Sequence, residues 1–490
     1  MRQFFNYIDG GWTGPEADAE RIPSINPYTG ERWAEISQAR PETVAAAVDA
    51  ATRALRSWRR VSGTDRSELL QNLAALIDDN ADRLALMETT DNGKVIRETR
   101  NQMSFCARNY RFFAGCADKL YGSYIPLDNY DSVDYAAWEP VGVCALLTGW
   151  NSPLQLLSNK LAPALAGGNT VVIKPSELAS ATTLEFMQLI EQAGFPPGVV
   201  NVVTGDHRVG AALCASPRIS KISFTGGSET GRVVMTAAAQ NLVPVTLELG
   251  GKSPNIIFAD ANLKRAVTGA IAGVFAATGQ TCMAGARLLI QDQVAAQVLG
   301  ELVERAQKIR MGDPRDPQTE MGPVCSAGQR DRVLSMVAQA RADGARLLTG
   351  GDAPRGLGSD LFVAPTVFDQ VSPQMALFRK EVFGPVVAVL PFTDEAQALA
   401  LANDSDFGLV AGVWTQDISR AHRMAKALEV GTVWINTYRM SVSQAPAGGI
   451  KQSGFGKERG WLGLMEYIKA KNVMVDYSES ERDPFTIRTQ

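Results

Sequence analysis

The sequence predicts an α/β protein built on a parallel sheet with helices on both faces. Short apolar segments alternate with helical segments from about residue 141 to residue 249, as in repeated strand–helix–strand units. The apolar segments are continuous rather than alternating, which is typical of strands buried on both faces. The chain has 490 residues. Because single cores stop growing near ~250–300 residues, we expect two to three domains.

The elements follow in order along the chain. Residues 41–58 have apolar side chains at helical spacing and begin with Pro41, which suits a helix start, and 66–87 shows the same pattern. In the alternating region we expect strands at 141–148, 169–174, 199–203, 219–224 and 245–249, with helices at 153–166, 181–193, 208–215 and 229–240. Ligands bind at the carboxyl ends of such strands. The first candidates are therefore the residues that follow strands: Asn151, Lys174, Gly205, Gly226 and Glu248.

The second half repeats this alternation less regularly. A helix is expected at 262–277, a Gly-rich surface loop at 350–360, and strands at 385–392, 410–415 and 432–436. Segment 121–140 alternates apolar and polar residues, which predicts a protruding β-arm. The tail at 473–480 could pair with this arm, within the chain or across a subunit boundary.

Composition excludes several classes of function. Lys and Arg number 48 against 52 Asp and Glu, a net charge of −4, which argues against a nucleic-acid or anionic-membrane binder. His207 and His422 are the only histidines, too few for a typical zinc site or Ser-His-Asp hydrolase, so we expect no metal. The six cysteines form no CxxC pair, as expected of reduced thiols. With no signal peptide or transmembrane run, the expected location is the cytoplasm.

Cys282 is the candidate nucleophile. It stands in GQTCMAG, where small neighbours leave the sulfur accessible. A buried core cysteine is the commoner explanation for a cysteine taken alone. The other five have apolar or helical neighbours and are expected in the core: Cys106, Cys116, Cys144, Cys214 and Cys325.

Glu248 and Asn151 are candidates for the remaining chemistry. Burial of a carboxylate at the end of an apolar strand raises its pKa toward neutrality, where it can act as a general base. The alternative is a strand-end Glu248 that reaches solvent. The Asn151 amide, in LLTGWNSP, could donate to a developing oxyanion, or it could simply stabilise the turn before Pro153.

Three segments are candidates for a nucleotide site. IKPSE offers Lys174 for a ribose hydroxyl and Glu177 for the adenosine 2′-hydroxyl, although it also suits an ordinary helix start. FTGGSETG (224–231) is a Gly-rich turn whose N–H groups could face a pyrophosphate, but Gly turns mostly serve geometry. EVFGPV places Glu381 and Phe383 before a strand, where a helix end and a core ring are the simpler explanation.

Together these segments resemble the aldehyde dehydrogenase superfamily, of the NAD(P)-dependent, hydrolytic, non-CoA-acylating type. The matching motifs occur in the order of the family: WNSP at 150–153, KPSE at 174–177, FTGGSETG at 224–231, ELGGKSPNI at 248–256, GQTCMAG at 279–285, EVFGPV at 381–386 and GGIKQSGFGKERG at 448–460. Length and spacing agree from about residue 8 to the C-terminus.

The resemblance implies roles for the candidates. Cys282 matches the nucleophile that forms a thiohemiacetal and then a thioester, and Asn151 matches an oxyanion donor. Glu248 matches the base that activates the hydrolytic water. CoA-acylating relatives typically lack this Glu, so a free acid product is implied. A CoA-acylating or semialdehyde-specific dehydrogenase is the first alternative, and a silent NAD-binding structural protein is a remote one.

The resemblance also implies a cofactor and a substrate pocket. The residues matching cofactor contacts are Trp150, Lys174, Glu177, Gly205, Gly226, Gly227, Leu249, Glu381 and Phe383. Glu177 would repel a 2′-phosphate, so NAD is favoured over NADP, although His207 and Arg208 offer positive charge nearby. The residues matching the substrate pocket are Ser152, Asn159, Thr281, Arg439, Ser441 and Ala447. Many relatives have Phe at 152, Trp at 159 and aromatic residues at 441 and 447, so we expect a wider, more polar pocket and a bulky or partly polar aldehyde. Arg439 could meet a substrate carboxylate or hydroxyl, or could be solvated.

The family fold implies three parts in this chain. A Rossmann-like NAD-binding domain would take residues 1–120 and 140–248, and an α/β catalytic domain 249–469. A small β oligomerisation arm would join 121–139 to 470–490. Relatives are mostly dimers or tetramers, and exposed strands in the arm suit pairing across subunits, so a homodimer or homotetramer is expected.

Overall fold

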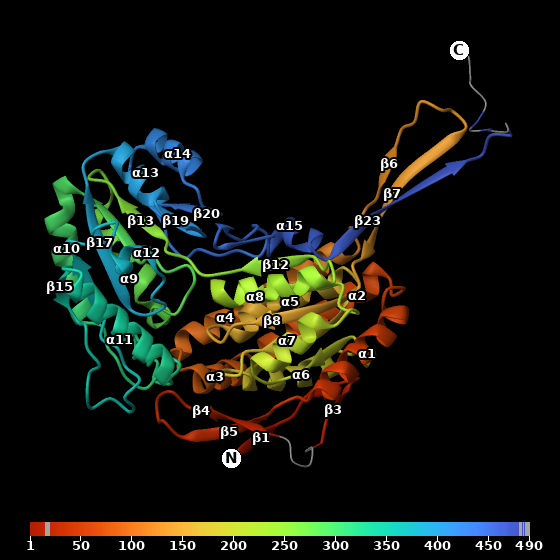
Figure 1. Ribbon diagram of the computed structural model, residues 1–490, viewed down its shortest axis with the longest axis horizontal. Helices are drawn as coiled ribbons and strands as arrows, with labels where there is room; N and C mark the ends of the chain where they lie inside the picture. Colours follow the sequence, from red (N-terminus) through yellow and green to blue (C-terminus); the bar gives the residue numbers. More distant parts are fainter. Residues whose placement is uncertain (15–19, 480–482, 484, 486–490) are drawn as a thin grey trace.

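The computed structural model describes residues 1–14, 20–479, 483 and 485. Within this part, two sheet-centred bodies lie side by side and a narrow β-arm projects from one of them (Figure 1). The last residues of the expected arm, 480–482, 484 and 486–490, lie outside the described residues, as do residues 15–19.

The first body contains an eight-stranded sheet in the order β22-β12-β11-β8-β9-β10-β2-β3. Its central strands are parallel to one another and form the alternating region expected from the sequence. The strands are β2 Tyr7–Ile8, β3 Gly11–Trp12, β8 Val143–Thr148, β9 Thr170–Pro175, β10 Val200–Val202, β11 Lys221–Thr225, β12 Val245–Glu248 and β22 Gly454–Phe455. The expected strands are confirmed to within two residues.

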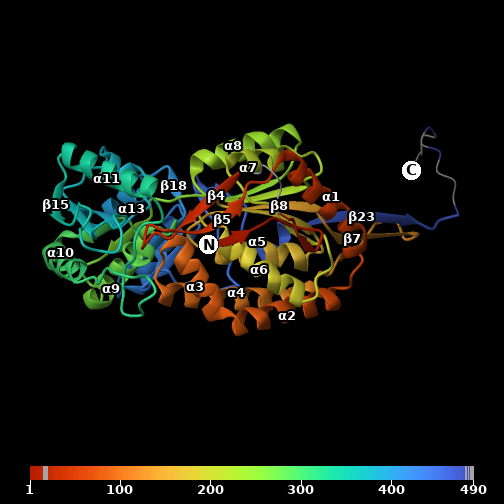
Figure 2. The same cartoon turned by 90° about the horizontal axis from the view of Figure 1, so that it is seen from below.

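Helices cover both faces of this sheet (Figure 2). One face packs against α1 Pro41–Trp58, α7 His207–Ala215 and α8 Ser228–Gln240. The other packs against α2 Gly63–Asp79, α3 Ala81–Asn92, α4 Ile96–Ala117, α5 Pro153–Ala166 and α6 Ala181–Gln192. The strands of the centre are buried throughout, which explains why they are continuously apolar.

The second body contains a seven-stranded sheet in the order β15-β16-β17-β14-β13-β19-β20. Its strands are β13 Pro254–Ile257, β14 Arg287–Gln291, β15 Arg346–Thr349, β16 Thr366–Asp369, β17 Val386–Phe392, β19 Val410–Trp414 and β20 Thr432–Ile435. Helices α9 Leu263–Val274 and α10 Asp292–Gln307 cover one face. Helices α11 Ala327–Ala342, α12 Ala376–Arg379, α13 Glu395–Asn403 and α14 Ile418–Ala427 cover the other. His422 lies on α14.

Smaller elements complete the described chain. Strands β1 Arg2–Phe4, β4 Arg21–Ile25 and β5 Arg32–Ser37 form a separate sheet, β18 Phe407–Gly408 pairs with β21 Ile450–Lys451, and α15 Gly460–Met465 packs on α5. The arm consists of β6 Ser123–Ile125, β7 Ser132–Pro140 and β23 Ile468–Asp476, in the order β23-β7-β6. The expected pairing of arm and tail is confirmed within the chain, where β23 pairs with β7.

The structure differs from the sequence expectation at three places. The helical region 66–87 is divided at Asn80, whose backbone (φ −108°, ψ 11°) lies outside the helical region. The helix expected at 262–277 ends at Val274, because Ala277 and Thr278 adopt positive φ on the way to the Cys282 loop. Strand β22 pairs antiparallel with β12, so Gly454–Phe455 belongs to the first sheet although the expected boundaries assign it to the second domain. No helix among the described residues has the length and apolar character needed to cross a membrane.

Candidate active site

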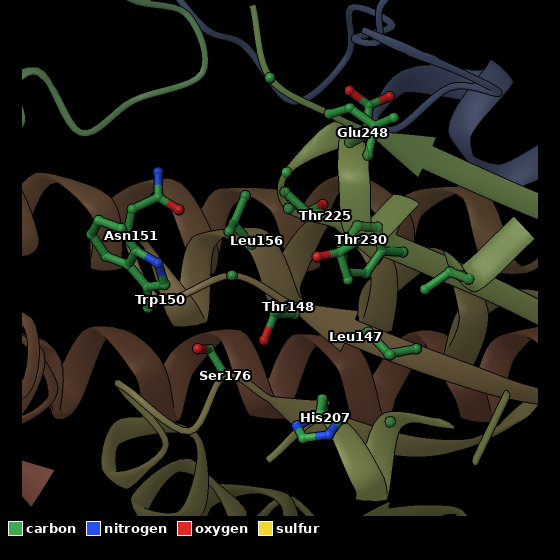
Figure 3. A pocket seen from close by; sticks show the side chains of 18 of the residues that line it. Leu147, Thr148, Trp150, Asn151, Leu156, Ser176, His207, Thr225, Thr230 and Glu248 are labelled. Carbon is green, nitrogen blue, oxygen red and sulfur yellow. The ribbon is translucent and has the colours of Figure 1, made fainter. Parts of the chain in front are cut away.

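A cavity of about 460 Å³ runs along the carboxyl ends of the strands of the first sheet. Figure 3 shows Glu248 and Asn151 toward one end of it and His207 at the other. Twelve of the sequence-predicted residues line this one cavity: Trp150, Asn151, Lys174, Glu177, Gly226, Gly227, Glu248, Leu249, Cys282, Glu381 and Phe383, with His207 as the expected rim residue. The topology therefore brings together side chains that the sequence distributes over more than 200 residues.

Cys282 stands in an irregular loop that follows a short 3₁₀ turn, Ala276–Gly279. Several contacts fix this loop: the N–H of Ala277 donates to Glu98 Oε1 at 2.9 Å, and the hydroxyl of Thr278 donates to the carbonyl of Gly322 at 3.1 Å. Gly279 has φ +69°, and a Cβ there would lie 2.1 Å from the carbonyl oxygen of Gly384, so only glycine fits. The loop holds Cys282 partly exposed, whereas the other five cysteines are buried, as expected from the sequence.

Burial raises the pKa of the Cys282 thiol to about 12, and the nearby carboxylates of Glu381, Glu248 and Glu458 contribute in the same direction. The resting side chain is therefore a thiol at neutral pH. A nucleophilic Cys282 needs a neighbouring base to remove its proton as it attacks.

Asn151 follows strand β8 and lies beside the Cys282 loop. Its Nδ2 donates to the carbonyl of Gln280 at 3.0 Å, which fixes the amide plane. An amide nitrogen carries two hydrogens, so the second remains available for an oxygen in the cavity. The side chain is thus oriented by the loop that carries Cys282 rather than by the turn before Pro153.

Glu248 is the last residue of β12, where the strand opens into the cavity. Its Oε1 atom is buried and has no hydrogen-bond partner. Burial and, to a smaller extent, the charge of Glu458 raise the pKa of this carboxyl to about 8, while Lys160, Lys457 and Arg459 oppose the shift. Glu248 thus has a pKa near the working pH and an oxygen without a hydrogen-bond partner, and it shares the cavity with a thiol. These are the properties of a general base.

A buried network lies behind Glu248. Lys160 Nζ pairs with Glu458 Oε1 at 2.5 Å and also donates to the hydroxyl of Ser223 at 3.0 Å. Asn159 Nδ2 donates to the other oxygen of Glu458 at 3.1 Å. The expected pocket residue Asn159 therefore contacts this network, and it does not line the cavity described above. Sequence reasoning did not find Lys160 or Glu458, because nothing in a helical segment marks a lysine as buried.

The far end of the cavity is formed by strand ends and helix starts. Lys174 is buried, donates to the carbonyl of Pro175 at 3.0 Å and lies 3.6 Å from a carboxylate oxygen of Glu177, which is partly exposed. Gly205 does not line the cavity. Its φ is +148° and a Cβ there would lie 2.4 Å from Val209 Cγ2, so this glycine serves the turn into α7.

Near Cys282 the cavity is bordered by an aromatic pair and a carboxylate. Trp150 and Phe383 meet edge to face with ring centroids 5.3 Å apart. Glu381 Oε1 accepts from the N–H of Gly251 at 3.0 Å, and burial raises its pKa to about 7. Gln329, which the sequence did not indicate, donates to the carbonyl of Phe383 at 2.7 Å and so fixes this loop.

The remaining expected pocket residues lie outside the cofactor-sized cavity. Ser152 accepts a hydrogen bond from the buried Lys94 ammonium at 2.6 Å. Arg439 is partly exposed and has partners within the chain, since it lies 3.9 Å from Glu98 and donates to the carbonyl of Ala272 at 3.3 Å. Thr281 is buried, whereas Ser441 and Ala447 are partly exposed. Among the described residues no cluster of His, Cys, Asp and Glu has the arrangement of a metal site.

The cavity brings together the residues that the resemblance assigns to a dehydrogenase with a cysteine nucleophile and a dinucleotide site. The chain matches the aldehyde dehydrogenase family over residues 12–473. It is 46% identical over 494 residues to (Z)-2-((N-methylformamido)methylene)-5-hydroxybutyrolactone dehydrogenase of Acinetobacter baylyi, with both chains covered completely. It is 43% identical to betaine aldehyde dehydrogenase of Bacillus subtilis, covering 95% of this chain and 96% of the relative.

Solved structures agree. The betaine aldehyde dehydrogenase of Staphylococcus aureus in complex with NAD⁺ superposes with a TM-score of 0.96 at 39% identity, covering 99% of this chain and 97% of that chain. A putative aldehyde dehydrogenase from Burkholderia cenocepacia has a TM-score of 0.97 at 41% identity, covering 99% and 100%. The protein belongs to the aldehyde dehydrogenase family, and it is an NAD-dependent aldehyde dehydrogenase.

The residues of the cavity fit NAD. The cavity is long and its walls are mostly apolar, while Lys174 and Glu177 at one end supply a donor and an acceptor for ribose hydroxyls. A Cβ at Gly226 would meet the ring of Phe224 at 2.4 Å, whereas Gly227 has open space beside it, so backbone N–H groups at the start of α8 can approach a pyrophosphate. Bound NAD supplies the hydride acceptor.

Proposed function

We propose that the protein oxidises an aldehyde to the free carboxylic acid through a covalent intermediate on Cys282. The observation that carries this proposal is the unpartnered oxygen of Glu248 in the cavity that also contains Cys282. A base held there can act twice, first on the thiol and then on a water.

In the first half of the reaction the Glu248 carboxylate takes the Cys282 proton as the sulfur attacks the carbonyl carbon. The free N–H of Asn151 donates to the oxygen of the resulting thiohemiacetal, as an oxyanion donor does. The thiohemiacetal oxygen is an oxyanion because Glu248 has taken the thiol proton, so transfer of the hydride from that carbon to NAD⁺ leaves a thioester on Cys282. Glu248 then releases its proton to solvent and is again a base. A pKa raised to about 8 places this carboxyl near the working pH, where it can both take up and release a proton.

In the second half Glu248 removes a proton from water, which attacks the thioester carbon. The C–S bond breaks, the acid leaves, and the sulfur of Cys282 recovers its proton. Its pKa of about 12 favours the thiol once the acid has left. Lys457 and Lys160 oppose the rise in the pKa of Glu248 and so keep part of it ionised.

We also propose that the substrate is bulky or partly polar. Support comes from the small or polar residues at the positions expected to border the aldehyde: Ser152, Asn159, Thr281, Arg439, Ser441 and Ala447. A pocket with those side chains holds little aromatic surface for a small aliphatic aldehyde. Acetaldehyde should therefore have a lower kcat/KM than functionalised or aromatic aldehydes, and the opposite order would refute this part.

The test of the mechanism is Glu248→Gln, which keeps the shape of the side chain and removes the base. We expect NADH in the first turnover at a reduced rate, a stable acyl-enzyme detectable by intact-protein mass spectrometry, and steady turnover reduced at least a hundredfold. A parallel reaction with added CoA tests the alternative in which the acyl group is transferred to CoA and not to water. Formation of acyl-CoA by the unaltered protein at a rate matching NADH production would favour the CoA-acylating alternative, and NAD binding without any NADH over a broad panel would favour a silent protein.

Assembly and location are further proposals. The edge strands β6 and β23 of the arm have no partner on their outer sides within the described chain, and such edges pair readily with another subunit. A homodimer or homotetramer would give a mass by light scattering of two or four times 52.7 kDa. Six free thiols suit a reducing compartment, which supports the cytoplasm.

A further inference from the structure

Arg459 is a partly buried arginine whose guanidinium has no hydrogen-bond or ion-pair partner in the described chain. It follows Glu458 directly and precedes α15. Within the described chain its side chain makes no hydrogen bond or ion pair, and its Nε is completely buried without an acceptor. Its two terminal nitrogens are likewise unbonded, but they are not among the fully buried atoms. Guanidinium groups removed from water normally find acceptors, because five N–H donors are otherwise lost to solvent.

The neighbouring carboxylate of Glu458 makes no hydrogen bond or ion pair with Arg459, although its charge acts on the guanidinium. The two Glu458 oxygens accept from Lys160 Nζ at 2.5 Å and from Asn159 Nδ2 at 3.1 Å. The guanidinium instead lies over the ring of Phe105 on α4, 5.8 Å from its centroid. A ring face holds a cation in place but leaves its N–H edge unsatisfied.

The backbone at Arg459 is strained. Its φ of 60° and ψ of 169° form a combination that is essentially confined to glycine and is unfavourable for other residues. The surroundings enforce it, since Ala447 and Glu458 exchange backbone hydrogen bonds of 2.7 and 2.8 Å immediately before this residue. Strain of this kind concentrates where a side chain must be aimed at a ligand.

The position of Arg459 indicates which ligand it meets. It does not line the cavity that fits NAD. Its neighbour Glu458 pairs through the backbone with Ala447. A Cβ on the residue after Ala447, Gly448, would lie 2.6 Å from Glu248 Oε1, so Arg459 approaches the reacting groups from another side. The charges of Glu458, Glu248 and Cys282 act on its guanidinium. The exchange of hydrogen bonds with Ala447 places the preceding residue against an expected substrate-pocket position. When NAD fills this cavity, the aldehyde must reach Cys282 by a path outside the cavity.

We propose that Arg459 binds a carboxylate carried by the aldehyde substrate, and that the substrate class is therefore aldehydes bearing an acid group. A planar fork of N–H donors matches a carboxylate in two parallel hydrogen bonds and would supply the acceptors that the folded chain does not. The proposal depends on the proposed function, because it says which residue binds the far end of the substrate whose aldehyde group is oxidised at Cys282.

The test compares each acid with its neutral amide: 4-formylbenzoate with 4-formylbenzamide, and 4-oxobutanoate with 4-oxobutanamide. We expect the unaltered enzyme to favour the acid by about tenfold or more in kcat/KM in at least one pair. Arg459→Met should bring that ratio to about one, mainly by raising KM for the acid. Arg459→Lys keeps the charge without the fork and should give an intermediate ratio. A preference for the amide in both pairs, or an acid preference that survives in Arg459→Met, would overturn the proposal.

Controls separate this inference from folding and from the reaction itself. Arg56, exposed on α1, provides the matched variant Arg56→Met, whose acid-to-amide ratio should equal that of the unaltered enzyme. Thermal unfolding and NAD binding report whether Arg459→Met is folded. If that variant is unfolded, the acid-to-amide ratio of Arg459→Lys tests the proposal in its place. NADH formation at equal rates from acid and amide refutes only the role of Arg459, whereas no NADH from any aldehyde refutes the proposed function.

Discussion

Replacing Lys160 by Met tests the buried network behind the base. The Lys160 side chain is fully buried and Glu458 is 5% exposed, with 2.5 Å between Nζ and Oε1. Removing one partner of such a pair leaves a buried charge without compensation and typically costs about 3–5 kcal/mol. At about 2.1 cal/mol/K per residue, the unfolding entropy of this chain is about 1 kcal/mol/K, so the loss corresponds to a Tm lower by about 3–5 °C.

The same substitution should act on catalysis through Glu248. Its folded pKa of about 8 lies above the ordinary carboxyl value, so the ionised base is lost as the pH falls through about 8. Lys160 lowers this pKa, and its removal therefore raises it. A rise of one unit reduces the ionised fraction at pH 7 about tenfold. Hydrolysis of a preformed acyl-enzyme, followed from pH 6 to 9.5, should show its midpoint moved upward in Lys160→Met.

Adding Glu458→Gln to Lys160→Met removes the isolated charge and provides the matched control. We expect this double variant to regain at least half of the lost Tm. The midpoint of its pH profile for acyl-enzyme hydrolysis should return toward that of the unaltered enzyme. A Tm change below 1 °C together with an unmoved midpoint would refute the reasoning, because the pair would then influence neither stability nor the base.

Two other substitutions test the cofactor and pocket assignments. Glu177→Gln should raise kcat/KM for NADP by about five- to tenfold, because the partly exposed carboxylate repels a 2′-phosphate by about 1 kcal/mol, and an unchanged NADP/NAD ratio would contradict its role. Ser152→Phe removes the 2.6 Å hydrogen bond from buried Lys94 and should cost about 1–3 kcal/mol of stability by urea unfolding. It should also raise KM for 4-formylbenzamide more than for acetaldehyde, while Ser152→Ala, which removes the hydrogen bond without filling space, should lower stability and leave that KM ratio unchanged.

The sequence determined the architecture around the site because its signals are local. Continuous apolar runs separated by amphipathic helices predicted that β8, β9, β11 and β12 lie in a parallel sheet, and ligand residues at strand ends follow from that arrangement. The motif residues Asn151, Glu248 and Cys282 could be named in advance since each stands next to a strand or in a loop of small residues.

Tertiary structure decided which polar groups are buried together. The partners Lys160 and Glu458 lie almost 300 residues apart, and only folding brings them to 2.5 Å, with Asn159 on the other oxygen. The same contacts leave Arg459 without an acceptor, a property that no spacing can reveal. Periodicity and motifs record what each segment does by itself, whereas desolvation and charge pairing depend on which distant segments meet.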